Sequence, residues 1–289
     1  MTNTTLEAPQ TETAPSSTHL SFPRVVRSEW IKLRTLRSTQ WSFAIFVLLT
    51  VGFGLLMATP LDTSNSPAID AETQKSLTVM VATFGVNFTQ LVVAVLGVLI
   101  ISGEYTTGMI RSTFTAVPTR LPALFAKALV LAVATFVVSL VSIIVTALVT
   151  APILSGQGIE GQLLDGEVMR ALVGGAGYLT LVALLAFGFG AILRNSAGGI
   201  ASVLGLILVV PSVLQILAGI TQSVWAQNLS AFLPSTAGAL MYTIGDGSAA
   251  GAIGADVITL DATQGFLVLL GWVAVMIIAA AALIKRRDA

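Results

Sequence analysis

The sequence predicts an all-α integral membrane protein with six membrane-spanning helices. Of its 289 residues, 55% are hydrophobic and only 10% are charged, and the mean hydropathy is +0.91. Soluble domains carry about 25% charged residues, so this chain is suited to lipid. Six apolar runs are each long enough to cross a hydrocarbon core, which takes about 20 helical residues.

Two segments precede the first apolar run. Residues 1–21 are rich in Thr, Ser, Pro and Glu, so we expect a disordered cytoplasmic tail. Residues 22–39 predict an amphipathic helix, because their apolar side chains recur on one face at about 100° per residue. Glu29 is an exception on that face. The helix is expected to anchor the chain in the inner headgroup layer, and Glu29 and Arg34 are also candidates for contact with a cytoplasmic partner.

The six predicted spans follow in order along the chain. They are residues 41–58, 79–102, 128–154, 171–193, 200–220 and 266–284. An even number of spans places both termini on one side of the membrane. All Lys and Arg residues except Lys75 and Arg170 fall on that side, so both termini are predicted to be cytoplasmic.

Polar residues within the second and fifth spans leave two interpretations open. Asn87 and Gln90 are three residues apart and therefore share a helix face. They either form hydrogen bonds between helices or line a weakly polar substrate path. In the fifth span, Pro211 is expected to bend or loosen the helix, and Gln215 follows it. The external loop, residues 221–264, is expected to form short interfacial helices in its first half.

Several classes of function are disfavoured by missing residues. The chain has no Cys, and its single histidine, His19, lies in the polar tail, so no catalytic residue is predicted. Asp246, Asp256 and Asp261 lack the spacing of a calcium loop, so no metal site is expected. The middle of each span has no ionisable residue, which disfavours a proton-driven carrier. The sequence has no phosphate-binding loop, so another polypeptide would have to hydrolyse ATP.

The segment "GEYTTGMIRSTFTAVPTR", residues 103–120, separates the second and third spans. Its apolar residues recur at helical spacing until Pro118, while Glu104 and Arg111 occupy the remaining surface. This pattern predicts a short amphipathic helix on the cytoplasmic face, although a simple connector would fit the same pattern. Glu104 is expected to pair with an arginine, either Arg111, Arg34 or Arg37, because an unpaired carboxylate at that depth is costly.

Four segments together resemble the permease subunits of bacterial ABC transporters of the ABC-2 type. They occur in the order "SEWIKLRTLRSTQW" (residues 28–41), the 103–120 segment followed by "AKALV" (126–130), "GFGAILRNSAGGIA" (188–201) and "FLPSTAGAL" (232–240). The resemblance implies that residues 22–289 form one permease domain of the bacterial cytoplasmic membrane. Within it, residues 22–39 would be a connecting helix and residues 103–120 a coupling helix.

The resemblance also implies partners and site residues. The chain would bind a separate ATP-binding subunit and a second permease chain, identical or not, and it would contact membrane lipid but no nucleic acid. ATP and Mg would be held by the ATPase, and this chain would need no cofactor. Glu104, Tyr105 and Arg111 would transmit the movement of the ATPase. The second and fifth spans would line the central cavity, which makes Asn87, Gln90, Pro211 and Gln215 candidate path residues.

The expected function is therefore the membrane half of an ATP-driven exporter. Its aliphatic, uncharged spans favour an amphipathic or hydrophobic compound, such as a drug, a lipid or a peptide. One alternative is an ion-coupled secondary transporter, because backbone carbonyls and hydroxyls can bind sodium without any charged side chain. Another is a membrane sensor or scaffold that transports nothing.

Overall fold

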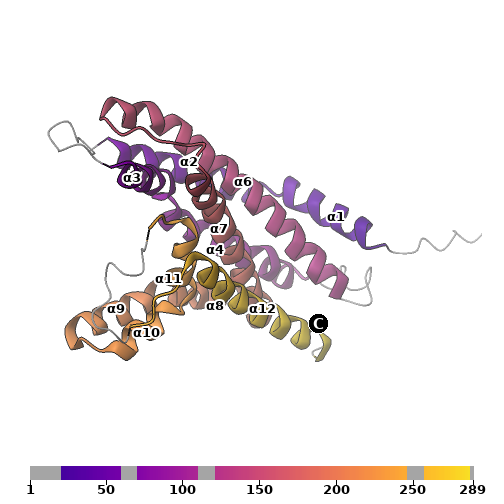
Figure 1. Cartoon of the computed structure of the whole chain (residues 1–289). Coiled ribbons are helices and arrows are strands. Elements are labelled where there is room, and N and C mark those ends of the chain that lie inside the picture. The colour runs from indigo at the N-terminus through magenta and orange to yellow at the C-terminus, as the bar shows by residue number, and fades with distance from the viewer. Residues whose placement is uncertain (1–20, 60–69, 110–120, 246–256, 287–289) are drawn as a thin grey trace, which may run out of the picture.

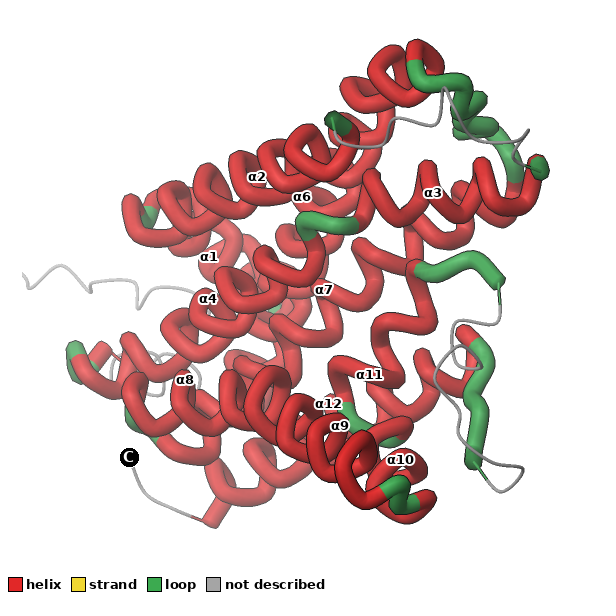
Figure 2. Tube along the Cα trace, turned by 90° about the vertical axis from the view of Figure 1, so that its left-hand side faces the viewer, coloured by secondary structure: helices red, strands yellow, loops and turns green. Residues whose placement is uncertain are grey.

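The computed structural model describes residues 21–59, 70–109, 121–245 and 257–286. Every regular element in these ranges is helical, and the helices form one bundle (Figures 1 and 2). Six segments are long and apolar enough to cross a membrane, which confirms the predicted fold class. The predicted tail, residues 1–21, falls almost entirely outside the described residues, as does most of the predicted coupling helix from residue 110 to residue 120.

The amphipathic helix and the first span are separated by one extended residue. Helix α1 covers Phe22–Thr35 and helix α2 covers Arg37–Ala58, with Leu36 at φ −71° and ψ 119° between them. The amphipathic helix expected over residues 22–39 therefore ends earlier, at Thr35, and the remaining residues begin the first span. An extended residue lets the chain turn from α1, which runs along the start of α6, into the span (Figure 1). The apolar face of α1 packs against α6 through Val25 and Ala126.

The second span is broken into two helices. Helix α3 covers Ala71–Thr83 and helix α4 covers Val86–Thr106, so the span begins earlier than the predicted residue 79. The break falls at Gly85, which packs closely against the backbone of α2. A Cβ atom on Gly85 would lie only 2.6 Å from the Thr50 carbonyl oxygen, so this contact requires glycine. Just beyond it, the rings of Phe53 and Phe88 stack with centroids 3.8 Å apart. The sequence did not predict this break, because it results from a contact with a distant helix.

Helix α7, Gly166–Leu193, forms the centre of the bundle. It contacts α4, α6 (Leu121–Gly156) and α12 (Ala262–Arg286). In its most hydrophobic stretch of 18 residues, 67% of the residues are buried inside the bundle. The corresponding share is only 22% for α2, for the fifth span and for α12. The three outer spans therefore keep most of their surface for lipid or for other proteins. The third and sixth spans extend beyond their predicted bounds at both ends, whereas the fourth begins earlier than predicted, at Gly166, and ends as predicted at Leu193.

The fifth span changes its helical geometry near Pro211, as expected. Helix α8, Ser196–Leu204, leads into a π-helical turn, η1, over Gly205–Val209, and α9 continues over Val210–Thr221. Proline has no backbone N–H and cannot pair with the carbonyl four residues earlier, which here belongs to Ile207 within the π turn. Pro211 thus marks the irregular place in this span.

Short helices cover one end of the bundle after α9. They are α10 (Val224–Ala231), α11 (Pro234–Ala239) and the 3₁₀ turn η2 (Leu240–Tyr242), as predicted for the first half of the 221–264 loop. Both α11 and η2 contact α7 and α12. The Trp272 Nε1 atom donates to the Phe232 carbonyl oxygen at 3.0 Å, which fastens this cover to α12.

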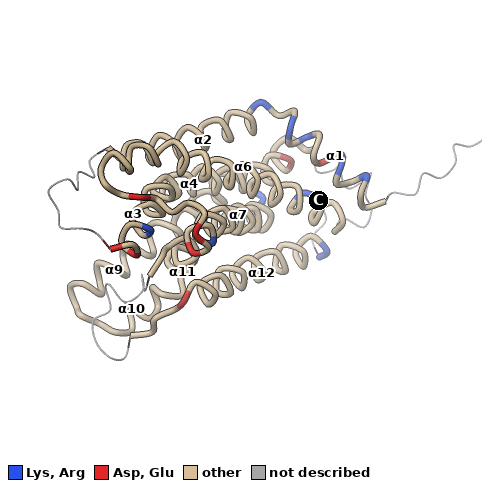
Figure 3. The backbone as a smooth tube through the Cα atoms, turned by 45° about the horizontal axis from the view of Figure 1, so that its top comes forward, with Lys and Arg blue, Asp and Glu red and all other residues tan. Residues whose placement is uncertain are grey.

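Charged residues separate to the two ends of the bundle (Figure 3). One end, here called the basic end, contains α1 and the last turn of α12 with Lys285 and Arg286. The opposite end, here called the distal end, contains the start of α3 and the start of α7. There the Lys75 ammonium lies 2.6 Å from the Asp165 carboxylate.

Candidate functional site

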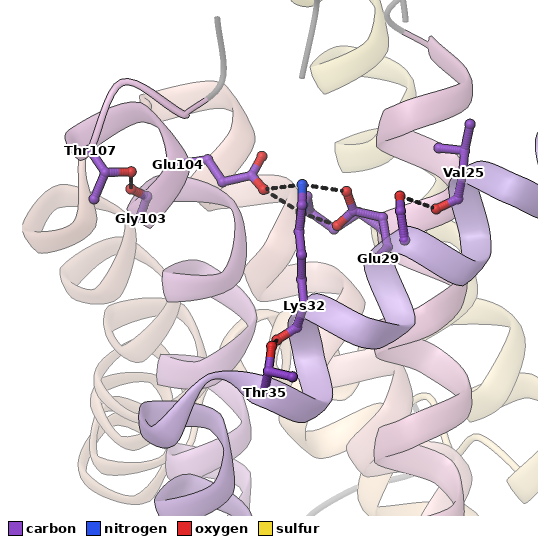
Figure 4. A network of polar contacts seen from close by, with 9 residues as sticks. Val25, Glu29, Lys32, Thr35, Gly103, Glu104 and Thr107 are labelled. Carbon is purple, nitrogen blue, oxygen red and sulfur yellow. Dashed lines mark hydrogen bonds and ion pairs between the residues drawn. The ribbon is translucent and has the colours of Figure 1, made fainter. Parts of the chain in front are cut away.

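Four charged side chains from three helices meet at the basic end. Glu29 and Lys32 come from α1, Glu104 from the end of α4, and Lys127 from the second turn of α6 (Figure 4 shows the first three with their contacts). Lys32 Nζ lies 2.8 Å from Glu29 Oε1 and 3.2 Å from Glu104 Oε1. Lys127 Nζ lies 2.8 Å from Glu104 Oε1 and also bonds Glu29 Oε2. We call these residues the ion cluster.

Most of the ion cluster is shielded from solvent. Glu29, Glu104 and Lys127 are 3%, 7% and 6% exposed, whereas the Lys32 side chain is 32% exposed. Two carboxylates and two ammonium groups together carry no formal net charge, which is the arrangement that makes burial of ions tolerable. Burial alone would lower the pKa of Lys32, but the hydrogen bond to Glu29 and the charges of Glu104 and Glu29 outweigh it and raise the pKa.

Local sequence explains how each member reaches the cluster. Glu29 sits on the apolar face of α1, which packs on α6, so its carboxylate is carried toward Lys127. Lys32 is one turn further along the same helix. Glu104 lies in the last turn of α4 and Lys127 near the start of α6, on either side of the connection between those spans. The cluster therefore ties α1 to both ends of that connection.

One carboxylate oxygen of the ion cluster accepts no hydrogen bond from the described residues. Glu104 Oε1 accepts from both lysines, but Glu104 Oε2 is buried and has no hydrogen-bond partner among the described residues. A buried carboxylate oxygen without a donor costs free energy comparable to that of a lost hydrogen bond. This oxygen is thus a vacant acceptor next to two ammonium groups.

Glu104 does not pair with Arg34 or Arg37, two of its three expected arginine partners, in the described chain. Its partners in the described chain are Lys32 and Lys127, not Arg34 or Arg37, both of which are exposed. The lysines were missed because pairing between distant segments depends on tertiary packing. The available signal was Glu29 on the apolar face of α1, since a carboxylate in that position requires a buried cation. Arg111 lies outside the described residues.

Tyr105, next to Glu104, turns toward the end of α7. The Arg194 guanidinium carbon lies 5.1 Å from the Tyr105 ring centroid, which is a cation–π distance. Arg194 ends α7 in a left-handed conformation at φ 52°. The residue that follows Glu104 is therefore in contact with the central helix, while Glu104 itself is tied to α1 and α6.

The candidate path residues do not share one environment. Gln90 is buried and accepts a hydrogen bond from the Tyr178 hydroxyl of α7, so its amide joins two helices. Asn87 is exposed, and its amide donates to the Phe84 carbonyl oxygen at the break of the second span. In the fifth span, Pro211 is buried against the bundle, whereas Gln215 is exposed on the outer face of α9. Only Asn87 and Gln215 are open to a partner or a substrate.

Removing one side of the Gln90–Tyr178 bond should destabilise the bundle moderately. Tyr178→Phe leaves the Gln90 carbonyl without its donor, and a hydrogen bond between spans is worth about 0.6–2 kcal/mol. Gln90→Leu should cost a similar amount, and the double variant should cost less than the sum. Unfolding in detergent measures each change. Ser139→Ala is the control, because the buried Ser139 hydroxyl of α6 has no hydrogen-bond partner among the described residues; equal losses for Tyr178→Phe and Ser139→Ala would contradict this assignment.

Fold and site together define a polytopic α-helical membrane protein whose buried charges gather at one end of its spans. The sequence then gives the family. A family model described as ABC-2 family transporter protein matches residues 25–212, more than half of the 289 residues, and the chain belongs to this family. It is therefore an ABC transporter permease. The matched range runs from Val25 in α1 through the π turn to Ser212 in α9 and includes all four residues of the ion cluster. No match was found among the curated proteins.

Proposed function

We propose that this permease exports an amphipathic or hydrophobic compound from a bacterial cytoplasmic membrane, driven by a separate ATPase bound at the basic end. The observation that carries the proposal is the ion cluster, which joins α1, α4 and α6 and includes Glu104 at the start of the 103–120 segment. In this assignment the basic end is cytoplasmic, as the distribution of Lys and Arg favours. Residues 103–120 form the coupling helix, and ATP and Mg belong to the ATPase.

The buried members of the ion cluster and the exposed residues near the coupling helix are proposed to have different roles. Glu29 and Glu104 are buried inside the chain, so they act by positioning the helices rather than by touching the ATPase. Arg111 and the exposed Arg34 remain the residues proposed to contact it. When the ATPase moves the coupling helix, the bonds of Glu104 to Lys32 and Lys127 would carry the displacement into α1 and α6.

The substrate path is proposed to lie between two permease chains. The second and fifth spans expose the polar side chains of Asn87 and Gln215, and the fifth span keeps most of its surface free. A second copy or a related chain would cover these faces and leave a weakly polar cavity. The spans are uncharged over most of their length, which favours an apolar or amphipathic cargo over a strongly charged one.

Arg111→Ala is expected to uncouple transport from ATP hydrolysis. Because Arg111 belongs to the proposed coupling helix, the variant should insert and assemble normally while substrate flux in vesicles falls and ATPase activity no longer responds to substrate. Lys285→Ala removes the same charge at the end of α12 and should change neither readout. Unchanged coupling in Arg111→Ala would overturn the coupling-helix assignment. Flux that needs no ATPase but follows an ion gradient would favour a secondary transporter instead.

Asn87→Leu is expected to change which compounds are carried. Its side chain is exposed and, in the described structure, bonds only the Phe84 carbonyl oxygen in the break just before its own helix, so its loss should cost little stability. Competition between labelled substrates in vesicles measures the selectivity, and thermal unfolding of the same preparation measures the stability. Unchanged selectivity with lowered stability would show that Asn87 serves packing rather than the path.

A further inference from the structure

A pocket opens between α1, α2, α4 and α6 beside the ion cluster. It has a volume of about 540 Å³, within the range of small-molecule sites, about 300–1,000 Å³. One part of its wall is aliphatic, and the other part contains the ion cluster and the start of α2. The aliphatic lining comprises Leu33, Leu36, Leu96, Leu99, Ile100 and Val130. The pocket is thus amphipathic, and its aliphatic residues Leu36 and Leu99 are 49% and 40% exposed at the surface.

The polar part of the pocket offers unused hydrogen-bonding groups of both kinds. Glu104 is 7% exposed and its Oε2 atom lacks a donor among the described residues. The Lys32 ammonium has three N–H donors, of which the structure uses two. Leu36, which precedes α2, provides no side-chain cap, so the first N–H groups of this 22-residue helix are available to an anion.

We propose that this pocket binds one zwitterionic phospholipid that carries a primary amine, namely phosphatidylethanolamine. Its ammonium donates to Glu104, its phosphate accepts from Lys32 and from the N–H groups that begin α2, and an acyl chain lies along the aliphatic wall. The headgroup is placed at the level of α1, the amphipathic helix, where headgroups of that leaflet lie.

Charge balance favours a zwitterion over an ion of either sign. The ion cluster is already neutral, so a cationic ligand or an anionic ligand would leave a net charge at a largely buried site. A zwitterion adds one positive and one negative group and keeps the balance. The Lys32–Glu104 distance of 3.2 Å is the longest in the cluster, and Lys32 is its most exposed member. The ammonium of the lipid can therefore replace Lys32 at Glu104 while Lys32 turns to the phosphate.

Native mass spectrometry of the full chain, purified in mild detergent with its bound partners, tests the proposal. The protein is offered equal amounts of phosphatidylethanolamine, phosphatidylcholine and phosphatidylglycerol with identical acyl chains. We expect one bound phosphatidylethanolamine, preferred at least about tenfold over phosphatidylcholine, whose quaternary ammonium has no N–H to donate. Equal binding of these two lipids would overturn the role of Glu104. A preference for phosphatidylglycerol would overturn the charge-balance argument.

A pair of glycine variants locates the bound lipid. Gly103 lines the pocket and has no heavy atom within 4 Å of an added Cβ, so the side chain of Gly103→Leu starts in open space at the pocket wall and is expected to occupy the pocket. Gly52→Leu adds the same side chain at a similarly open position on α2, away from the pocket lining. Gly103→Leu should lose the bound lipid, and Gly52→Leu should keep it. Equal retention would place the lipid elsewhere and contradict the proposal.

The same variants separate a lipid from a protein occupant. If Gly103→Leu keeps the lipid preference of the unaltered chain but loses the second permease chain or the ATPase, the pocket holds a protein segment and the lipid assignment is wrong. Headgroup preference in the unaltered chain requires no variant to fold. Because lipid binding is measured without transport, its outcome is independent of the proposed export.

Discussion

Lys127→Met is expected to destabilise the folded chain by about 3–5 kcal/mol, the usual cost of removing one partner from a buried ion pair. Lys127 is 6% exposed and bonds both Glu29 and Glu104. Methionine keeps much of the length of the side chain but removes the charge, so two buried carboxylates would share Lys32 alone. Thermal unfolding in detergent and the amount of chain recovered from membranes both measure the loss.

Two further variants test whether the cluster causes this loss. Lys285→Met removes an exposed lysine from the last turn of α12 and should leave stability unchanged. Glu104→Gln combined with Lys127→Met restores neutrality and should recover much of the stability lost in the single variant. If Lys127→Met unfolds at the same temperature as Lys285→Met, the ion cluster does not hold α1 and α6 together.

Gly174→Ala is expected to displace the short helices that cover the distal end. A Cβ atom at Gly174 would lie 1.9 Å from the Met241 carbonyl oxygen in η2, which is a backbone atom that cannot turn aside. Overpacking of this kind costs about 1–3 kcal/mol. We expect a lower unfolding temperature and a loosened contact between η2 and α7, because the backbone of η2 has to move.

Cysteine labelling can detect that movement, since the chain has no native Cys. Ala237 in α11 is fully buried, so a Cys introduced there should resist a maleimide in the parent chain and react in the Gly174→Ala background. Gly271→Ala is the matched control, because an added Cβ on that glycine of α12 has no heavy atom within 4 Å. Equal labelling in both backgrounds would contradict the close packing of η2 on α7.

The sequence predicted the membrane-spanning helices better than the breaks within and between them. Apolar runs identified all six spans, and Pro211 correctly marked the irregular turn of the fifth. The break at Gly85 was not predicted, because a glycine in an apolar run is ordinary, and only its contact with Thr50 on another helix shows why the span divides there. The extended backbone at Leu36 was missed for a similar reason, since it depends on how α1 packs against α6.

The site was predicted in part. Glu29 and Glu104 were both singled out, the first as a misfit on an apolar face and the second as a carboxylate at the end of a span. Their pairing through Lys32 and Lys127 joins positions up to 98 residues apart, and no local pattern encodes such a distance. Charge alone therefore indicated which residues needed partners, while the packing of three helices decided which partners they found.

Helix α6 connects the ion cluster at one end of the bundle with the opposite end. Its 36 residues extend for about 54 Å, almost twice the hydrocarbon thickness of a bilayer, about 30 Å. Lys127 lies near one end, and just past the other the Gln157 amide bonds the Ala58 carbonyl oxygen of α2 at 3.1 Å. If α6 pivots as a rod about Lys127, the arm to its far end is about 44 Å long, so each 5° of tilt carries that end about 4 Å sideways. A small change of angle at the ion cluster would thus become a displacement at the opposite membrane face as wide as a methylene chain.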